Sequence, residues 1–205
     1  MNHRFLILAA QAVSLLFSPF YLPVVAFILL LVFSYLHLLP LSYKVLLLAI
    51  VYTFTVLLPR LSIYVYRKAN KLTSRQLGHR QNRYVPYLIS ILSYASLLYV
   101  MRRIHMPHFT LGIIVAALAI QVVCALINLR KKVSAHSAAA GGVVGALMGF
   151  SIIFVFNPMW ALCSAVLLTG AVASARLILR QHTLGEVGLG VLVGVLCGFL
   201  SVLCV

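Results

Sequence analysis

Acidic residues are almost absent from this sequence: a single glutamate, Glu186, stands against sixteen lysines and arginines. Charged residues of all kinds make up only 8% of the 205 residues, whereas 64% are hydrophobic. A soluble domain of this length needs a polar surface, and so few polar side chains cannot provide one. The chain is therefore expected to lie in a bilayer, where runs of about 20 apolar residues cross the hydrocarbon core as helices.

The sequence also lacks any C-x-x-C spacing, low-complexity tail, Pro/Ser-rich linker or evident internal repeat. Its four cysteines fall inside apolar runs, which indicates small core residues rather than disulfides or metal ligands. Residues 1–17 are basic and then apolar, like a signal peptide. We expect them to be retained as a helix that lies in the interface or leads into the first span. The whole chain, 1–205, is thus expected to form one transmembrane domain.

Apolar runs predict an all-α integral membrane protein, a single bundle of six to seven transmembrane helices. Pro19 and Pro23 predict a kink or re-entry at the first run, and Pro59 and Arg60 are expected to interrupt the second. Residues 1–66 are expected to supply N-terminal helices, and residues 67–205 the functional core. The expected spans are 20–37, 43–66, 87–101, 109–129, 137–156, 158–179 and 187–203.

Three polar stretches, 67–86, 130–137 and 174–186, are each separated from the next by two spans. A pair of spans returns the chain to the same face of the membrane, so all three stretches should meet on one side. The stretches carry many cations and two histidines that begin or precede spans. These candidates for an anion site are Arg80, Arg83, Arg130, Lys131, Lys132, Arg176, Arg180, His136 and His182.

Two interpretations of these residues stay open. Guanidinium groups and helix N-termini bind phosphate oxygens, but cations at helix ends also anchor membrane proteins to anionic headgroups. Glu186, four residues after His182, favours a site, because carboxylates on membrane helices are usually functional. Thr183 and Glu186 also fit a capping box that starts the last helix. The two roles of Glu186 are compatible.

The segment from Arg176 to Glu186, RLILRQHTLGE, is similar to the S-R-x5-H-x3-D signature of the type 2 phosphatidic acid phosphatase superfamily. S-A-H, ending at His136, resembles its P-S-G-H signature, and HRQNRYVP, with Arg83, loosely echoes K-x6-R-P. The resemblance covers about residue 71 to the C-terminus. The chain departs from the family pattern at Val133, Ala135, Ala175 and Glu186, and Lys132 or Lys71 would replace the first-signature lysine.

The resemblance implies a lipid phosphatase in which His182 attacks phosphorus and becomes phosphohistidine. Glu186 would orient and charge that imidazole, and His136 would protonate the leaving oxygen. Arg180 occupies an unspecified position of the signature and is expected to matter less than Arg176. One carboxylate cannot build a two-metal site, so no metal or cofactor is expected. The residues that would hold the phosphate oxygens are Arg176, Arg83, Lys132, Ser134 and Arg80.

The expected partners are the bilayer and a lipid phosphate, with no nucleic acid. Polyprenyl pyrophosphate, phosphatidic acid, phosphatidylglycerol phosphate and lipid A all present phosphate at the headgroup level. A phosphotransferase of the same fold and a non-catalytic lipid-phosphate binder or transporter are the alternatives. An integral protein of the cell (inner) membrane is expected. Many bacterial members of the superfamily work on the periplasmic face, but the excess of cations in the site-side loops predicts a cytoplasmic site.

Overall fold

The computed structural model describes residues 3–71 and 84–205, and this part of the chain forms helices and no strands. Six of its helices are long and apolar enough to cross a membrane, which confirms the predicted all-α membrane bundle. They are the continuous helix Leu41–Ala69, α6 (Tyr84–Arg103), α7 (His108–Asn128), α8 (Ala135–Ile153), α9 (Met159–Ile178) and α10 (Leu184–Cys204).

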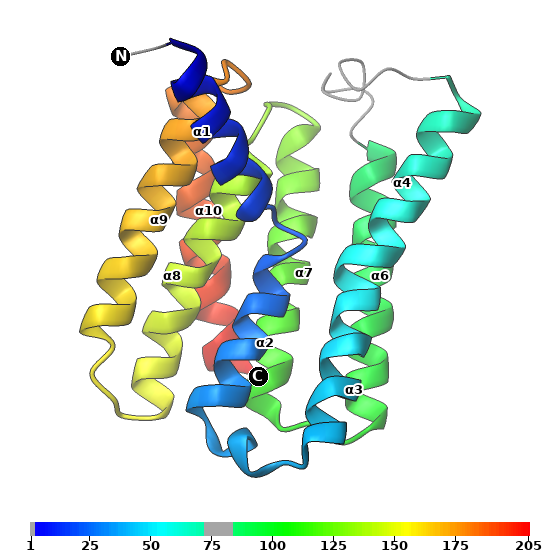
Figure 1. The fold of residues 1–205 in the computed structure, drawn as a ribbon, viewed down its shortest axis with the longest axis vertical. Coiled ribbons are helices and arrows are strands. Elements are labelled where there is room, and N and C mark those ends of the chain that lie inside the picture. The colour runs from blue at the N-terminus through cyan, green and yellow to red at the C-terminus, as the bar shows by residue number, and fades with distance from the viewer. Residues whose placement is uncertain (1–2, 72–83) are drawn as a thin grey trace.

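The N-terminal segment forms a first helix, as expected, and the run expected at 20–37 forms a short helix and a 3-10 turn instead of a long span. α1 (His3–Leu16) and α2 (Leu22–Phe33) follow one another toward the opposite end of the bundle (Figure 1), and the short 3-10 helix η1 (Tyr35–Leu38) ends this region. Pro19 lies in the break, and its carbonyl accepts a hydrogen bond from the Tyr94 hydroxyl at 3.3 Å. Pro23 stands in the first turn of α2, where a helix does not need its N–H. The two prolines therefore account locally for the break between α1 and α2.

The expected interruption at Pro59 and Arg60 is absent. α3 (Leu41–Tyr52), a π-helical turn η2 (Thr53–Leu57) and α4 (Leu58–Ala69) form one uninterrupted helix. The wider π turn ends just before Pro59, and such turns accommodate residues that disturb the regular hydrogen-bond ladder. Arg60 is held by Tyr21, whose hydroxyl accepts from Nη1 at 2.6 Å.

The direction of the helices brings the polar stretches to one end of the bundle. In Figure 1 the end of α4, the α7–α8 turn and the α9–α10 turn all lie at the top, and we call this the site end. The start of α3 and the end of α6, with Lys44 and Arg103, lie at the other end. The pairing of spans in the sequence predicted this arrangement. Residues 72–83 of the first polar stretch lie outside the described residues.

α8 and α10 run in the same direction and pack more closely than any other pair of helices in the described part. The contact depends on glycine. A methyl group on Gly141 would lie 2.5 Å from the Val191 carbonyl oxygen, and one on Gly194 would overlap the carbonyl oxygen of Ala138. Small residues at four-residue intervals allow such approach in lipid. The N-terminal ends of α8 and α10 consequently lie side by side at the site end.

Candidate functional site

A hollow of about 320 Å³ lies at the site end, where α9 turns into α10. It collects residues of the turn together with one cation from the α7–α8 connection, Lys132. Polar and charged groups line it except at Leu177. The lining residues are Lys132, Leu177, Arg180, Gln181, His182, Thr183 and Glu186.

The turn itself has a defined backbone geometry. Arg180 adopts a left-handed conformation, with φ of 51°. The N–H of Gln181 donates to the Arg176 carbonyl at 3.2 Å, and the N–H of Arg180 donates to the Leu177 carbonyl at 2.9 Å. These two bonds form a Schellman motif, in which the left-handed position is usually occupied by glycine. A side chain there costs about 1 kcal/mol or more, so the chain keeps a cation at the rim of the hollow at some cost in stability.

His182 and Glu186 form an ion-pair geometry inside the hollow. Nδ1 of His182 lies 2.7 Å from Oε2 of Glu186, with the two side chains 1% and 22% exposed. Thr183 caps α10, because its hydroxyl accepts from the Glu186 N–H at 3.4 Å. The Glu186 carboxylate thus pairs with the His182 imidazole, while the Glu186 N–H donates to the Thr183 hydroxyl. A carboxylate on Nδ1 fixes the orientation and the tautomer of the ring.

The surroundings of the hollow favour an anion. The Ser134 N–H donates to the Glu186 carbonyl at 3.2 Å and ties the start of α8 to the first turn of α10. Two helix N-termini, each with positive dipole character, therefore lie next to each other. Lys132 Nζ donates to the Gln181 carbonyl at 2.7 Å, which holds a second cation beside Arg180.

Ser134 has a structural role in this arrangement. It is fully buried, and its hydroxyl accepts from the Ser137 N–H at 3.3 Å and lies 2.9 Å from the Ser137 hydroxyl. These contacts cap α8. A role for Ser134 as a phosphate ligand requires this hydroxyl to exchange partners, and it stays a prediction.

The remaining predicted residues do not line the hollow. Arg176, in the last turn of α9, is 8% exposed, and its Nη1 donates to the Ser14 hydroxyl of α1 at 2.7 Å. His136 lies half-buried in the first turn of α8. Arg80 and Arg83 lie outside the described residues. The structure thus brings together four of the predicted residues at the hollow, Lys132, Arg180, His182 and Glu186.

Sequence reasoning expected Arg176 to matter more than Arg180, whereas the structure places Arg180 and not Arg176 at the hollow. It also missed Ser14. A helix that ends in basic residues without a following glycine was the available signal for Arg180. Ser14 carried no signal, because it lies 162 residues from Arg176 in the chain.

Within the described ranges, no three His, Cys, Asp or Glu side chains come close enough to share a metal ion. The ionisable groups that line the hollow are a histidine, its carboxylate partner and two cations. Comparisons with family models, with curated proteins and with solved structures found no match to this chain. The resemblance to the phosphatase signatures thus stands on the residues of the chain alone.

Proposed function

We propose that the chain is a membrane-embedded lipid phosphatase that hydrolyses a lipid phosphate monoester or pyrophosphate through a phosphohistidine intermediate. The observation that carries this proposal is the 2.7 Å pairing of Glu186, the only acidic residue of the chain, with His182. The pair lies in a hollow whose rim holds Lys132 and Arg180. Hydrogen-bonded imidazole and carboxylate, with nearby cations, are the groups that metal-free phosphoryl transfer needs.

In the proposed reaction, Nε2 of His182 attacks phosphorus in line with the leaving oxygen, and the bond from phosphorus to that oxygen breaks. Glu186 holds the proton on Nδ1 and stabilises the positive charge that develops on the ring. Lys132 and Arg180 neutralise the phosphoryl oxygens. His136 is the proposed acid that gives a proton to the leaving oxygen. Water then gives a proton to His136 and attacks phosphorus, and the bond from phosphorus to Nε2 breaks. This releases inorganic phosphate and restores both histidines.

The position of the hollow at the start of a membrane-length helix supports a lipid substrate. α10 begins at Leu184 and contains 21 residues, and at about 1.5 Å per residue it spans about 30 Å, the thickness of the hydrocarbon core. His182 and Thr183 therefore lie at the boundary where lipid phosphates are found. A phosphate can reach the hollow while its lipid stays in the membrane.

The test is phosphate release by the purified protein from a panel of lipid phosphates in nanodiscs, with His182→Ala as the comparison. We expect release from at least one lipid, unaffected by EDTA, and a loss of at least about a thousandfold in the variant. Normal gel-filtration behaviour of the variant is the control for folding. Absence of release from every lipid, or full activity of His182→Ala, would contradict the proposal.

Product analysis separates the alternatives. A phosphorylated acceptor in place of free phosphate would identify a phosphotransferase. Saturable binding of a lipid phosphate without any product would identify a binder or transporter.

A further inference from the structure

A buried hydrogen bond joins α1 to the end of α9 that leads into the hollow. Nη1 of Arg176 donates to the Ser14 hydroxyl at 2.7 Å, and both residues are 8% exposed. A hydrogen bond from a charged donor is stronger than a neutral one, and burial in a medium of low dielectric strengthens it further. The bond therefore attaches α1 to α9 at a defined point.

The side of α1 that faces α9 consists of small residues. Among residues 5–16, Ala10 and Ser14 are buried, and their spacing of four places them on one side of the helix. Leu8 and Leu15 are largely exposed. In the described part of the chain, α9 is the one element with which α1 makes more than slight contact. Small side chains allow this close approach in lipid, and it brings the Ser14 hydroxyl to Arg176.

The segment that follows α1 is held from the other side of the bundle. The Tyr94 hydroxyl of α6 donates to the Pro19 carbonyl at 3.3 Å. Arg60 of α4 donates to the Tyr21 hydroxyl at 2.6 Å and lies over the same ring, 4.6 Å from its centre. α1 is therefore held by α9 along its length and by α4 and α6 at the break that ends it.

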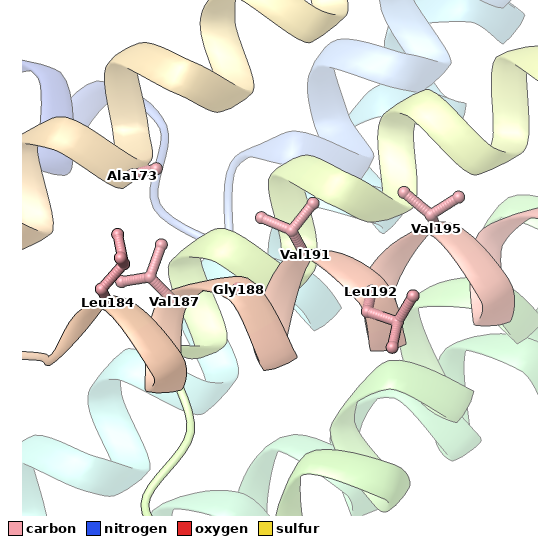
Figure 2. Close-up of a pocket in the computed structure, with 7 residues that line it drawn as sticks. All are labelled: Ala173, Leu184, Val187, Gly188, Val191, Leu192 and Val195. Carbon is pink, nitrogen blue, oxygen red and sulfur yellow. The ribbon is translucent and has the colours of Figure 1, made fainter.

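α9 depends on this attachment because α10 contacts it only slightly. An apolar groove of about 500 Å³ lies beside the first half of α10, and Figure 2 shows Val187, Val191 and Val195 projecting from that helix. Of the seven residues that line the groove, α9 supplies Ala173 and α10 supplies the rest. Among the described elements α9 packs mainly on α8 and α1. α1 is thus one of two helices that determine where α9 ends.

Arg176 also belongs to the turn that builds the hollow. Its carbonyl accepts from the Gln181 N–H at 3.2 Å, and the carbonyl of Gln181 in turn accepts from Lys132 Nζ at 2.7 Å. The next residue, Leu177, lines the hollow, and its carbonyl accepts from the Arg180 N–H at 2.9 Å. A single residue is therefore bound to α1 through its side chain and to the turn through its main chain.

We propose that Ser14 and Arg176 are positioning residues of the hollow. Their bond fixes the end of α9, and the turn that follows then places the rim cations Lys132 and Arg180 beside His182. The inference rests on the proposed function for the reaction only, and not for the geometry. Arg176 acts through the turn on this inference, whereas the resemblance to the phosphatase signature would make it a phosphate ligand.

Hydrogen exchange in phosphatidylcholine nanodiscs tests this link without requiring turnover. Ser14→Ala removes the acceptor, and we expect the amides of residues 180 and 181 to exchange at least about fivefold faster than in the unmodified chain. Ser14→Thr keeps a hydroxyl and should restore slow exchange.

Ser18→Ala is the matched control for this experiment. Ser18 follows α1 and is 7% exposed, and its hydroxyl makes no hydrogen bond to another helix in the residues that the structure describes. The α9–α10 turn should exchange in this variant as it does in the unmodified chain. Exchange in α6 should be unchanged in both alanine variants, which excludes a general loss of stability.

Kinetics of an active protein separate positioning from direct contact with phosphate. Ser14→Ala should raise the KM for a lipid phosphate about tenfold and leave kcat nearly unchanged, because it displaces cations that bind the phosphate. The pH dependence of kcat should stay the same, since His182 and Glu186 are untouched. Ser14→Ala should add little further to the loss in an Arg176→Ala chain, because residues that share one bond are not additive.

Equal exchange of the turn in Ser14→Ala and Ser18→Ala would overturn the inference. Loss of phosphate release in Arg176→Ala, with an unchanged KM in Ser14→Ala, would overturn it as well, because Arg176 would then contact phosphate itself. Faster exchange in Ser14→Ala without phosphate release from any lipid would support the positioning role and reject the phosphatase. Phosphate release with unchanged exchange would do the reverse.

Discussion

At the scale of single residues, a substitution of Glu186 can distinguish its proposed role in catalysis from its role in capping α10. A capping box accepts glutamine as readily as glutamate at its last position, so Glu186→Gln should preserve α10 on either interpretation. It removes the negative charge that, in the proposed reaction, stabilises the positive charge developing on the His182 ring. We therefore expect phosphate release to fall by about 10²–10⁴-fold, with the melting temperature within a few degrees of the unmodified chain. Full activity of Glu186→Gln would leave Glu186 with a structural role only.

Arg180 allows stability and activity to be changed in opposite directions. Glycine is the preferred residue at its left-handed position, so Arg180→Gly should leave the free energy of unfolding unchanged or raise it by up to about 1 kcal/mol. The same change removes a cation from the rim of the hollow. We expect the KM for a lipid phosphate to rise about tenfold or more.

Thermal unfolding and phosphate release, measured on the same preparation of Arg180→Gly, check both expectations. Arg180→Lys keeps the charge and the backbone strain, and it should retain more activity than Arg180→Gly. Unchanged kinetics in Arg180→Gly would support the sequence-based expectation that this arginine matters little.

Local spacing explains which residue contacts could be predicted. His182 and Glu186 lie four positions apart at the start of a helix, a spacing that places side chains on one face, so their pairing follows from the sequence. The bond between Arg176 and Ser14 joins α9 to α1 across the fold. No local pattern encodes it, because it depends on how a broken N-terminal helix lies against the bundle.

At the scale of helices, the α8–α10 contact should be intolerant of a single methyl group. Gly194→Ala would place a carbon against the Ala138 carbonyl, and overpacking of this kind costs about 1–3 kcal/mol. We expect a clear fall in melting temperature and a loss of phosphate release, since the starts of α8 and α10 build the site. Gly170→Ala, which has no neighbour within 4 Å, is the matched control and should be neutral or slightly stabilising. Equal melting of the two variants would contradict the packing account.

The helices also show which structural features hydropathy does not predict. Hydropathy located the long spans, because crossing a membrane requires a run of apolar residues. It joined residues 20–37 into one span, whereas α2 has only 12 residues and is too short to cross alone. The separation of α9 from α10 was equally hidden, since it results from where the glycines of α10 direct its packing. Such features depend on how two helices pack together, which the hydropathy of a single segment does not encode.

At the scale of the whole molecule, pairs of spans determine where the polar stretches go. Each hairpin returns the chain to the face it left, so the order of apolar and polar segments was sufficient to place the ends of α4, α7 and α9 together. The hollow itself was not predictable at this scale. Its shape depends on the left-handed residue Arg180 and on the reach of Lys132 to the Gln181 carbonyl.

The last prediction concerns which side of the membrane the site faces. The described cations at the site end are nine: Arg4, Arg67, Lys68, Lys71, Arg130, Lys131, Lys132, Arg176 and Arg180. The opposite end holds three, Lys44, Arg102 and Arg103. Loops rich in Lys and Arg remain in the cytoplasm, so we predict that the hollow opens to the cytoplasm.

Cysteine labelling in intact cells checks this orientation. In a background without the four native cysteines, Lys131→Cys reports the site end, and Asn157→Cys reports the opposite end, in the α8–α9 turn. Both positions are exposed. An impermeant maleimide should label Asn157→Cys in intact cells and Lys131→Cys only after lysis, which also shows that both thiols are reactive. The reverse pattern would place the site on the outer face and would leave the helical arrangement and the His182 chemistry unchanged.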